Sequence, residues 1–521
     1  MIIPVSQGSP PEELVTVVGG GCGRWQICIT IVSFMVILIH GLDIYSSKAA
    51  TPHFVNYTCA DNSGSQCLNA NGSKCENFVF WKQHDVTTFT EKFKLVCEKE
   101  HSGMWVRNCF CIGLMFGYVM SGWCADRFGK KIVAMICIPL QCILGVFLIS
   151  ITNYFTMLFF ATMQGLCSAS IYLIARVAVC EAVGNKWRTF VLGLTFLPLP
   201  ISLAVSQFFY KMFNDIETVI AVISVLPLIF LVPLLYFKDS PHYILLFADF
   251  DKAEGAVRKI ARFNKKHIPS DIRIRPVQII ENEIPPVHLC HLFLKSCKIR
   301  NICFALTCLW FFEGFASEIL LIYLYDDFEN LYCFALGGVL GVIISTILCH
   351  FINHKIIIGM FNFLKCCSIL GIFLLDVHLR ETNNISGFVL KLTSSFFLFL
   401  SHGTLANLTP RMFSTDLRAQ SLGFCWAVYY FGCVILTVIF TYSHRSILWG
   451  IVTVLIVISP LFETYSCFWL WNVHDRELPD ILEDIINFEK FYKPRRFVTI
   501  HDRQVTPHEM EVKSVNLNDT E

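Results

Sequence analysis

Long apolar runs separated by short polar turns set the pattern of this sequence. A helix needs about 20 apolar residues to cross the hydrocarbon core of a bilayer, so twelve spans would occupy roughly 240 residues. We predict membrane-spanning helices over residues 25–45, 132–151, 154–180, 189–213, 218–237, 302–325, 332–352, 356–377, 388–408, 422–440 and 447–470, with one more between 102 and 126.

The composition agrees with a membrane protein. The 521 residues are 55% hydrophobic and 16% charged, and the mean hydropathy is +0.57. A soluble protein would carry roughly a quarter of charged residues. The net charge of +1, with no basic stripe outside the loops, gives no indication of nucleic-acid binding. We predict an all-α polytopic membrane protein, surrounded by lipid, with twelve transmembrane helices.

Polar segments divide the chain into four parts. The predicted parts are an N-terminal six-helix half over 1–237, a cytoplasmic linker over 238–300, a C-terminal six-helix half over 301–471 and a cytoplasmic tail over 472–521. In the linker, Val257, Ile260 and Ala261 have helical spacing with basic residues between them. This pattern fits either a helix lying on the inner leaflet or a solvated helix that joins the halves.

The polar loop over 47–103 has the features of an extracellular segment. It contains four cysteines, which we expect to form two disulfides, with three connectivities possible. It also contains two N-glycosylation sequons, and a third sequon follows the ninth span. Since no cleavable signal pattern starts the chain, we expect both termini to be cytoplasmic. The cysteines are Cys59, Cys67, Cys75 and Cys97, and the sequon asparagines are Asn56, Asn71 and Asn384.

A charged turn follows the second span. Gly117 and Gly122 lack side chains where helices could approach closely, and Gly129 suits a backbone with positive φ. Asp126 is well placed to face the positive N-terminus of another helix. The turn resembles the loop between helices 2 and 3 of the major facilitator superfamily, which implies that superfamily's fold. Its cations, which mark the cytoplasmic side, are Arg127, Lys130 and Lys131.

The two halves repeat one motif. Glu181 and Arg188 lie seven residues apart after the fourth span. Arg411 and Arg418 also lie seven residues apart, after the tenth span and 230 residues later. Two six-span repeats with a substrate site between them are typical of transporters.

Several motifs, taken in order along nearly the whole chain, resemble the organic cation, anion and zwitterion transporter family of that superfamily. The resemblance implies a diverged plasma-membrane carrier of small organic ions, with such an ion as its partner. The motifs are GRWQ at 23–26, FKLVC at 93–97, EAVGNKWR at 181–188, DSPHYIL at 239–245, TPRMFSTDLR at 409–418, FET at 462–464 and LPD at 478–480.

The second half departs from the family pattern. The resemblance places a glutamate where Arg411 stands and a proline where Ser414 stands. The turn after the eighth span keeps only Lys355 of the family's usual charges, and the family's acid in that span falls near Leu340. These losses put gating and transport in question.

Charged residues at the cytoplasmic ends of spans 2, 4, 10 and 11 are predicted to form a reversible gate between the halves. Alternating access requires contacts that break, and ion pairs at the wet membrane edge suit that requirement. The alternative is that they are only topology signals and surface charge. The gate candidates are Asp126, Arg127, Glu181, Arg188, Arg411 and Arg418.

Charged and polar groups at membrane depth are the substrate candidates, because a charge there usually faces a cavity or a partner. Glu313, flanked by aromatic residues, is expected either to bind substrate or to pair with Lys391 or His402. Lys365, in a span that is peripheral in the superfamily, is expected to snorkel to the interface. The substrate-binding candidates are Glu313, Phe311, Arg176, His402 and Tyr430.

Tyr430 occupies the position that the resemblance links to selectivity. It lies twelve residues past Arg418, where the family's cation carriers tend to have Asp and its anion carriers Arg. A tyrosine can hold a cation on its ring face and a polar group with its hydroxyl, or it can simply pack against the eighth span. Neither of those charges is present here, and it is Glu313 that favours cationic or zwitterionic substrates.

No catalytic triad, metal-ligand spacing or phosphate-cradling loop occurs in the sequence, so we expect neither an enzyme nor a cofactor. One hypothesis is a carrier that works by alternating access. The alternative is a transporter-like protein that no longer transports and acts as a binding or regulatory partner. The intact turn at Asp126 favours the first hypothesis, and the departures in the second half favour the alternative.

The topology makes a first testable prediction. Asn56, Asn71 and Asn384 should carry glycans, because all three sequons fall in predicted extracellular loops. Deglycosylation should therefore change the gel mobility of the wild-type protein and leave the mobility of a triple Asn→Gln variant unchanged. A glycan found at Asn407 or Asn518 would contradict the predicted order of spans.

Overall fold

The structure is a computed structural model of the chain. It describes residues 21–51, 57–60, 67, 74–75, 77–80, 87–231, 250–268, 272–273, 297–324, 328–374, 385–442, 445–473, 478–479 and 500–501.

Helices of the first half form one bundle. Its long helices are α2 (Arg24–Ala49), α4 (Glu100–Phe128), α5 (Lys130–Leu148) and α6 (Tyr154–Ala182). The bundle is completed by α7 (Asn185–Leu194), α8 (Pro198–Met212) and α9 (Ile216–Val225), and α9 continues as the 3₁₀ helix η2 (Leu226–Phe230). Two short helices, α3 (Phe89–Lys92) and η1 (Cys97–Lys99), precede α4.

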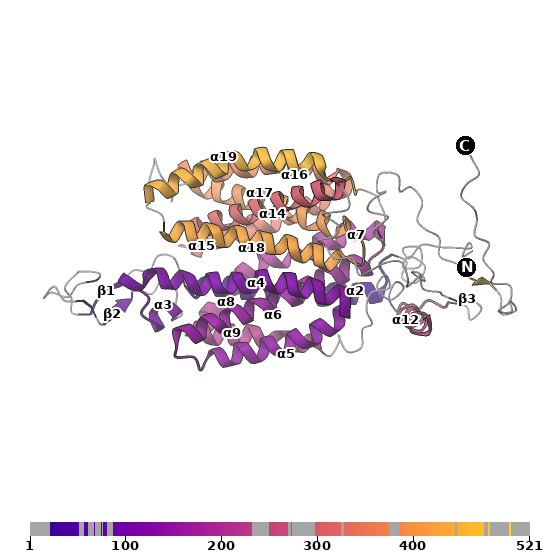
Figure 1. Ribbon diagram of the computed structural model, residues 1–521, viewed down its shortest axis with the longest axis horizontal. Helices are drawn as coiled ribbons and strands as arrows, with labels where there is room; N and C mark the ends of the chain where they lie inside the picture. The colour runs from indigo at the N-terminus through magenta and orange to yellow at the C-terminus, as the bar shows by residue number, and fades with distance from the viewer. Residues whose placement is uncertain are drawn as a thin grey trace.

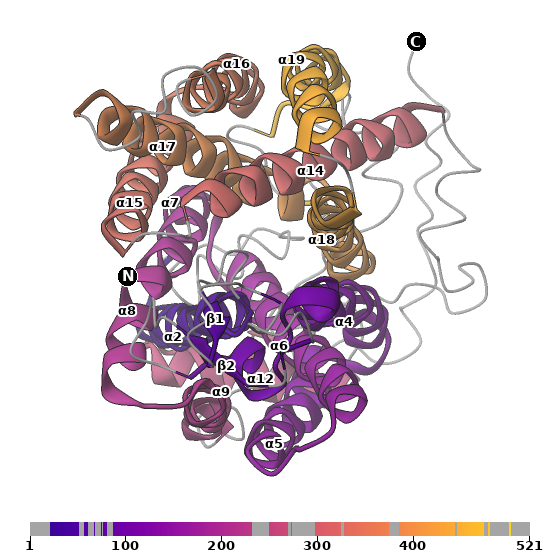
Figure 2. The same ribbon diagram turned by 90° about the vertical axis from the view of Figure 1, so that its left-hand side faces the viewer.

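Helices of the second half form another bundle, stacked on the first (Figures 1 and 2). Its helices are α14 (Cys297–Leu324), α15 (Phe328–Phe351), α16 (His354–Leu374), α17 (Ile385–Leu408), α18 (Arg418–Tyr442) and α19 (Arg445–Trp469), with the 3₁₀ turn η4 (Thr409–Arg411) after α17. The two bundles meet where α18 lies along α4 and where α15 packs against α7 and α8.

Eleven helical segments of the described chain are long and apolar enough to cross a membrane. The sixth predicted span is represented by the shorter apolar segment Ile216–Phe230, and the rest of that span, beyond 231, lies outside the described residues. The predicted fifth span is interrupted, because α7 ends at Leu194 and α8 begins at Pro198. Proline lacks the N–H needed to continue an α-helix, which accounts for the break.

Helix α12 (Phe250–Phe263) is docked on one end of the first bundle. Its apolar residues Val257, Ile260 and Ala261 are buried against Trp25 and Ala182. The backbone N–H of Trp25 also donates to the side-chain oxygen of Asn264, just past the helix, over 2.8 Å. The inner-leaflet interpretation is therefore wrong for these three apolar residues, since protein covers them.

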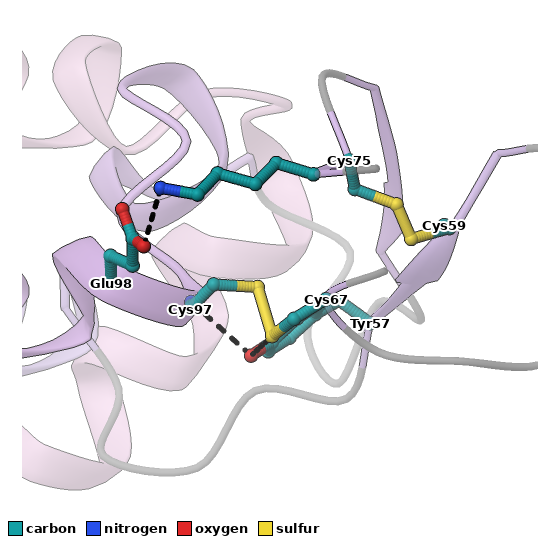
Figure 3. The surroundings of a disulfide bond; sticks show 7 residues. Tyr57, Cys59, Cys67, Cys75, Cys97 and Glu98 are labelled. Atoms are coloured by element: carbon teal, nitrogen blue, oxygen red, sulfur yellow. Dashed lines mark hydrogen bonds and ion pairs between the residues drawn. A yellow bond between two sulfur atoms is a disulfide. The ribbon is translucent and has the colours of Figure 1, made fainter. Parts of the chain in front are cut away.

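The cysteine-rich loop lies at the opposite end of the molecule (Figure 1). Strand β1 (Tyr57–Cys59) pairs antiparallel with β2 (Phe78–Phe80), and the two-residue strands β3 (Ile272–Arg273) and β4 (Ile500–His501) pair elsewhere. Figure 3 shows the disulfides Cys59–Cys75 and Cys67–Cys97, so the prediction of two bridges is confirmed and its connectivity is now assigned. Because Cys97 begins η1, the second bridge fixes the loop to the start of α4. The sequon residues Asn56, Asn71 and Asn384 lie outside the described residues.

The disulfides make a second prediction. A thiol reagent applied to the purified, denatured protein should leave Cys59, Cys67, Cys75 and Cys97 unlabelled until a reductant is added, because disulfide sulfurs do not react with it. Cys297, which is free and exposed, should be labelled without reduction and serves as the control. Mapping by mass spectrometry under non-reducing conditions should recover the two stated pairs, and a Cys59–Cys67 linked peptide would refute them.

Candidate functional site

Two groups of contacts join the bundles at opposite ends of the molecule. We call the end that carries α12 the Asp126 end, and the end next to the cysteine-rich loop the Glu318 end (Figure 1). Between them, α4, α6 and α2 of the first bundle face α14, α17 and α18 of the second (Figure 2). The candidate site is this seam between the two bundles.

At the Asp126 end, the last turn of α4 caps the N-terminus of α18. The carboxylate of Asp126 accepts hydrogen bonds from the backbone N–H groups of Ala419, over 3.3 Å, and Gln420, over 2.8 Å. The first N–H groups of a helix have no partner within it and carry partial positive charge, so a buried carboxylate is stabilised there. The contact predicted for Asp126 is confirmed, and the helix that it caps belongs to the other half.

Glycines allow α4 and α18 to approach this closely. A Cβ at Gly122 would lie 2.6 Å from the carbonyl oxygen of Ala419, and a Cβ at Gly423 would lie 2.2 Å from that of Tyr118. Any side chain at either position would therefore push the bundles apart. Gly117 faces α6 instead, and Gly129 has the predicted positive φ of 96° at the turn into α5.

Glu181, fully buried at the end of α6, binds two cations. Lys130 of α5 reaches it from the same half. Arg418 of α18 reaches it from the other half, with Nη1 3.0 Å from Oε1. Glu181 and Arg418 are thus brought together as predicted, whereas Lys130 is a missed member of the group. The available signal for Lys130 was its position four residues after Asp126 in the cationic turn.

The repeated motif makes the same bond in each half. The Nε of Arg188 donates to the carbonyl of Cys180 over 2.9 Å, and the Nε of Arg418 donates to the carbonyl of Pro410 over 3.0 Å. Both bonds join residues eight positions apart at the end of a helix. The internal repeat read from the sequence therefore has a structural counterpart.

Two gate candidates have other surroundings. Arg411 donates to Thr189 Oγ1 of α7 over 2.9 Å and to the carbonyl of Val473 over 2.8 Å, so it also crosses between the halves. Arg127 does not join the group, because its exposed guanidinium lies 5.4 Å from the ring centroid of Trp123 on the outer side of α4. The prediction that Arg127 clusters with the others is therefore wrong.

At the Glu318 end, one buried carboxylate binds two cations of the other half. Lys48 of α2 lies 3.0 Å from Glu318 Oε2, and Arg107 of α4 pairs with Glu318 Oε1. Next to them, Thr437 of α18 donates to Asn108 Oδ1 of α4 over 2.6 Å. Neither cation was among the predicted site residues. Lys48 was placed in the extracellular loop although it belongs to the last turn of α2, and Arg107 lies within the predicted second span. The sequence feature that could have identified Lys48 was a cation directly after the apolar run of the first span.

A cavity of about 50 Å³ lies between the two ends. That volume holds a few water molecules. Two predicted substrate residues, His402 and Tyr430, line it, whereas Glu313, Phe311 and Arg176 are absent from the described lining. The lining consists of His40, Ile44, Tyr45, Lys48, Cys111, Leu199, Ser317, Glu318, Leu321, Phe334, Leu398, Phe399, His402, Trp426, Tyr429, Tyr430 and Cys433.

Glu313 is paired within the second half. Its Oε2 lies 2.7 Å from Nζ of Lys365 on α16, and its Oε1 accepts a hydrogen bond from Ser401 of α17. Neither of the two expected partners, Lys391 or His402, makes this contact. Lys365 is buried between α14, α16 and α19, so the expectation that it snorkels to the interface is wrong. Two buried acids, Glu313 and Glu463, lie within hydrogen-bond distance of its ammonium, which accounts for its position inside the bundle.

Arg176 and Phe311 have partners outside the cavity lining. Arg176 donates to the carbonyl of Leu192 over 2.7 Å and, across the seam, to that of Ala406 on α17 over 3.0 Å. It is a further tie between the halves. The ring of Phe311 lies 6.3 Å from that of Phe431, between α14 and α18.

A polar chain in the first half ends at the cavity. Ser168 and Gln141 both donate to Asp43 Oδ2, over 2.7 and 2.6 Å. Since the single hydroxyl proton of Ser168 is used for Asp43, Nδ1 of His40 donates to Ser168 Oγ over 2.9 Å, and its Nε2 accepts from the hydroxyl of Tyr118 over 3.0 Å. These bonds fix one neutral tautomer of His40. Among the described residues, no group of His, Cys, Asp and Glu has the arrangement of a metal site.

Comparison with known proteins bears on what this arrangement does. The profile described as Major Facilitator Superfamily matches residues 99–437. An organic cation transporter-like protein of Drosophila melanogaster is 24% identical over 218 residues, covering 42% of this chain and 38% of that protein. Solute carrier family 22 member 4 of Mus musculus is 25% identical and covers 81% of this chain and 76% of its own. The match to the Drosophila protein spans only about two fifths of that protein's length.

Solved structures resemble the fold. The proton:xylose symporter XylE bound to 6-bromo-6-deoxy-D-glucose has a TM-score of 0.61 and 13% identity, and it covers 87% of this chain and 98% of its own. The inward-open conformation of XylE from E. coli has a TM-score of 0.60 and covers 89% of this chain. At such low identity the likeness establishes the fold alone, and it confirms the predicted major facilitator architecture.

The ion group at the Asp126 end makes a third prediction. Arg418→Met should expose Cys180, which is buried with its Sγ 3.9 Å from Pro410 O across the seam, because it removes the cation that joins Glu181 to the second half. Loss of about 1.4 kcal/mol in that contact would raise the labelling rate of Cys180 roughly tenfold.

Lys130→Met is the matched control, since it also removes one cation from Glu181 but none of the contact between halves. Labelling should be followed by mass spectrometry on the purified protein. Equal rates at Cys180 in the two variants would show that the pair between Glu181 and Arg418 does not hold the halves together.

Proposed function

Because this chain belongs to the major facilitator superfamily, we propose that it is a plasma-membrane carrier of small organic ions that works by alternating access. The superfamily and the fold are those of membrane transporters, and the chain is a multi-pass membrane protein rather than an enzyme. Relatives named organic cation transporters and members of solute carrier family 22 support an organic ion as substrate.

One observation carries the proposal. Buried ion pairs join the halves at both ends of a single seam, through Glu181 and Arg418 at one end and through Lys48, Arg107 and Glu318 at the other. A cavity lined by aromatic rings lies between these two sets of pairs. Alternating access requires two contacts that open in turn around one central site, and this arrangement supplies both. In the conformation described here, both contacts are made.

The orientation follows from charge. Arg127, Lys130 and Lys131 lie at the Asp126 end, and an excess of Lys and Arg marks cytoplasmic loops. We therefore place the Asp126 end and both termini in the cytoplasm. The disulfides at the Glu318 end support an extracellular position for that end, because disulfides persist in oxidising surroundings.

The cavity favours a cationic or zwitterionic substrate. Trp426, Tyr429 and Tyr430 present rings to it, and a ring face attracts a cation by roughly 0.5–2 kcal/mol. Of the two acids on α14, Glu318 lines the cavity, whereas Glu313 is engaged by Lys365. The carboxylate of a zwitterion would replace that of Glu318 as the partner of Lys48. Its cationic group would then lie among the aromatic rings. The cavity must widen for such a substrate, which opening of one end would provide.

The alternative function, a binding or regulatory partner that does not transport, has one observation in its favour. Arg411 stands where the family resemblance implies a glutamate, and it is fixed by a hydroxyl and a backbone carbonyl, from Thr189 and Val473. A cation therefore stands at this contact between the halves, where the resemblance implies an acid.

Uptake by oocytes expressing the chain provides the fourth prediction. A panel of labelled organic cations, anions and zwitterions should include at least one cation or zwitterion that is taken up saturably. Tyr430→Leu should weaken its apparent affinity about tenfold, roughly 1.4 kcal/mol, because the ring face is lost. Tyr430→Phe keeps the ring and is the matched control, with affinity near that of wild type.

Surface biotinylation should accompany every measurement, so that poor expression is not read as lost transport. No saturable uptake of any compound by protein that reaches the surface would reject the carrier and favour the alternative. Saturable uptake confined to anions would keep the carrier and reject the proposed substrate class.

A further inference from the structure

A second buried charge group lies inside the second half, away from the seam. It consists of Glu313 on α14, Lys365 on α16 and Glu463 on α19, and we call it the Glu–Lys–Glu cluster. The exposed fractions of these residues are 2%, 0% and 0%. No step of the proposed transport cycle uses Lys365 or Glu463, so the cluster requires its own explanation.

The hydrogen bonds of the cluster leave one carboxylate oxygen without a donor. The ammonium of Lys365 has three protons, and they point to Glu313 Oε2 at 2.7 Å, Glu463 Oε1 at 3.1 Å and Asn362 Oδ1 at 3.3 Å. Ser401 supplies the donor for Glu313 Oε1. Glu463 Oε2 is buried and has no hydrogen-bond partner. All donors of the cluster therefore bind other acceptors, and none remains for Glu463 Oε2, the fourth carboxylate oxygen.

The charges of the cluster do not cancel. Two carboxylates face one ammonium, which leaves a net charge of −1 if both acids are ionised. An uncompensated charge buried in protein costs several kcal/mol, and two carboxylates that share a site do not both stay ionised. A proton on the free oxygen removes that charge. A metal cation would need several oxygen ligands, and within the described residues the cluster offers one free carboxylate oxygen.

Other titratable groups around the cluster do not replace that proton. Cys366 on α16 and Cys467 on α19 present thiols, and Tyr429 on α18 presents a phenol. His402 on α17 lies within electrostatic range of Lys365, and Lys355 on α16 lies within electrostatic range of Cys467. The ion pairs of both carboxylates within the described chain are with Lys365 alone.

We propose that the Glu–Lys–Glu cluster is a proton-binding site of the second half, with the proton carried by Oε2 of Glu463. The cluster holds one proton together with the ammonium, so that α14, α16 and α19 pack around a neutral group. On one side it approaches the cavity, because Ser401, which donates to Glu313, is the neighbour in sequence of His402, and His402 lines the cavity. Gain or loss of this proton therefore changes the charge of a group one residue removed from the cavity lining.

Infrared spectroscopy of the purified full-length protein at neutral pH tests the site, and this readout needs no substrate. A protonated carboxyl group has a carbonyl stretch that carboxylates lack. Glu463→Gln should remove the signal of one such group per chain. Glu313→Gln should remove the same signal, because Glu463 is then the only acid facing Lys365 and becomes ionised. Lys365→Met should instead add the signal of a second protonated carboxyl.

Glu318→Gln is the matched control, since Glu318 is a buried acid on the same helix that already faces two cations and should contribute no protonated signal. Unchanged protonated-carboxyl signals in both Glu463→Gln and Glu313→Gln would overturn the proposal. A signal that appears in wild type only after sodium is replaced by a large organic cation would also overturn it, because a metal ion would then occupy the oxygen. If Lys365→Met does not fold, the two Gln variants still decide. Failure to find transport leaves this result unaffected.

Discussion

The contact between the carboxylate of Asp126 and the first N–H groups of α18 determines how the two halves fit together. It joins an acid at the end of one helix to the positive end of a helix in the other half, and the glycines at 122 and 423 let the two backbones come close enough for it. The same approach stacks the ring of Tyr118 on those of Trp426 and Tyr430, with centroids 5.7 and 5.8 Å apart. Trp426 and Tyr430 also line the cavity, so the approach of α4 to α18 contributes to its aromatic wall.

The buried charges divide into two kinds. Glu181 and Glu318 each pair with two cations, and at least one of those pairs crosses the seam. The Glu–Lys–Glu cluster has the opposite balance and lies within one half. Buried ion pairs often contribute little net stability, because desolvation offsets their attraction, yet they are costly to break singly. Ion pairs between the two halves can form in one conformation and break in another. Ion pairs within one bundle stay together when the halves move relative to each other.

The carrier and the non-transporting alternative differ in what those seam contacts must do. A carrier requires that each end separate in turn, so its ties must be comparable in strength and exchange protein partners for water or substrate. A binding protein requires only that one arrangement persist. The tie formed by Arg176 uses a backbone carbonyl of the other half, whereas those formed by Arg418 and Glu318 use opposite charges. The seam therefore contains both neutral and charged contacts.

The sequence by itself determined the helices, their order in two repeated halves, the capping role of Asp126 and the meeting of Glu181 with Arg418. Hydrophobic length encodes the helices, and a motif repeated at a fixed interval indicates the two halves. The two contacts join residues 293 and 237 positions apart, and they were predicted from motifs that resemble those of a known family rather than from periodicity. Only the tertiary structure decided which charges pair: Lys48 and Arg107 with Glu318, Lys365 with both Glu313 and Glu463, and Arg127 with Trp123 outside the gate. A long side chain on a helix can reach several neighbours, and helix rotation and packing, which periodicity does not fix, select among them.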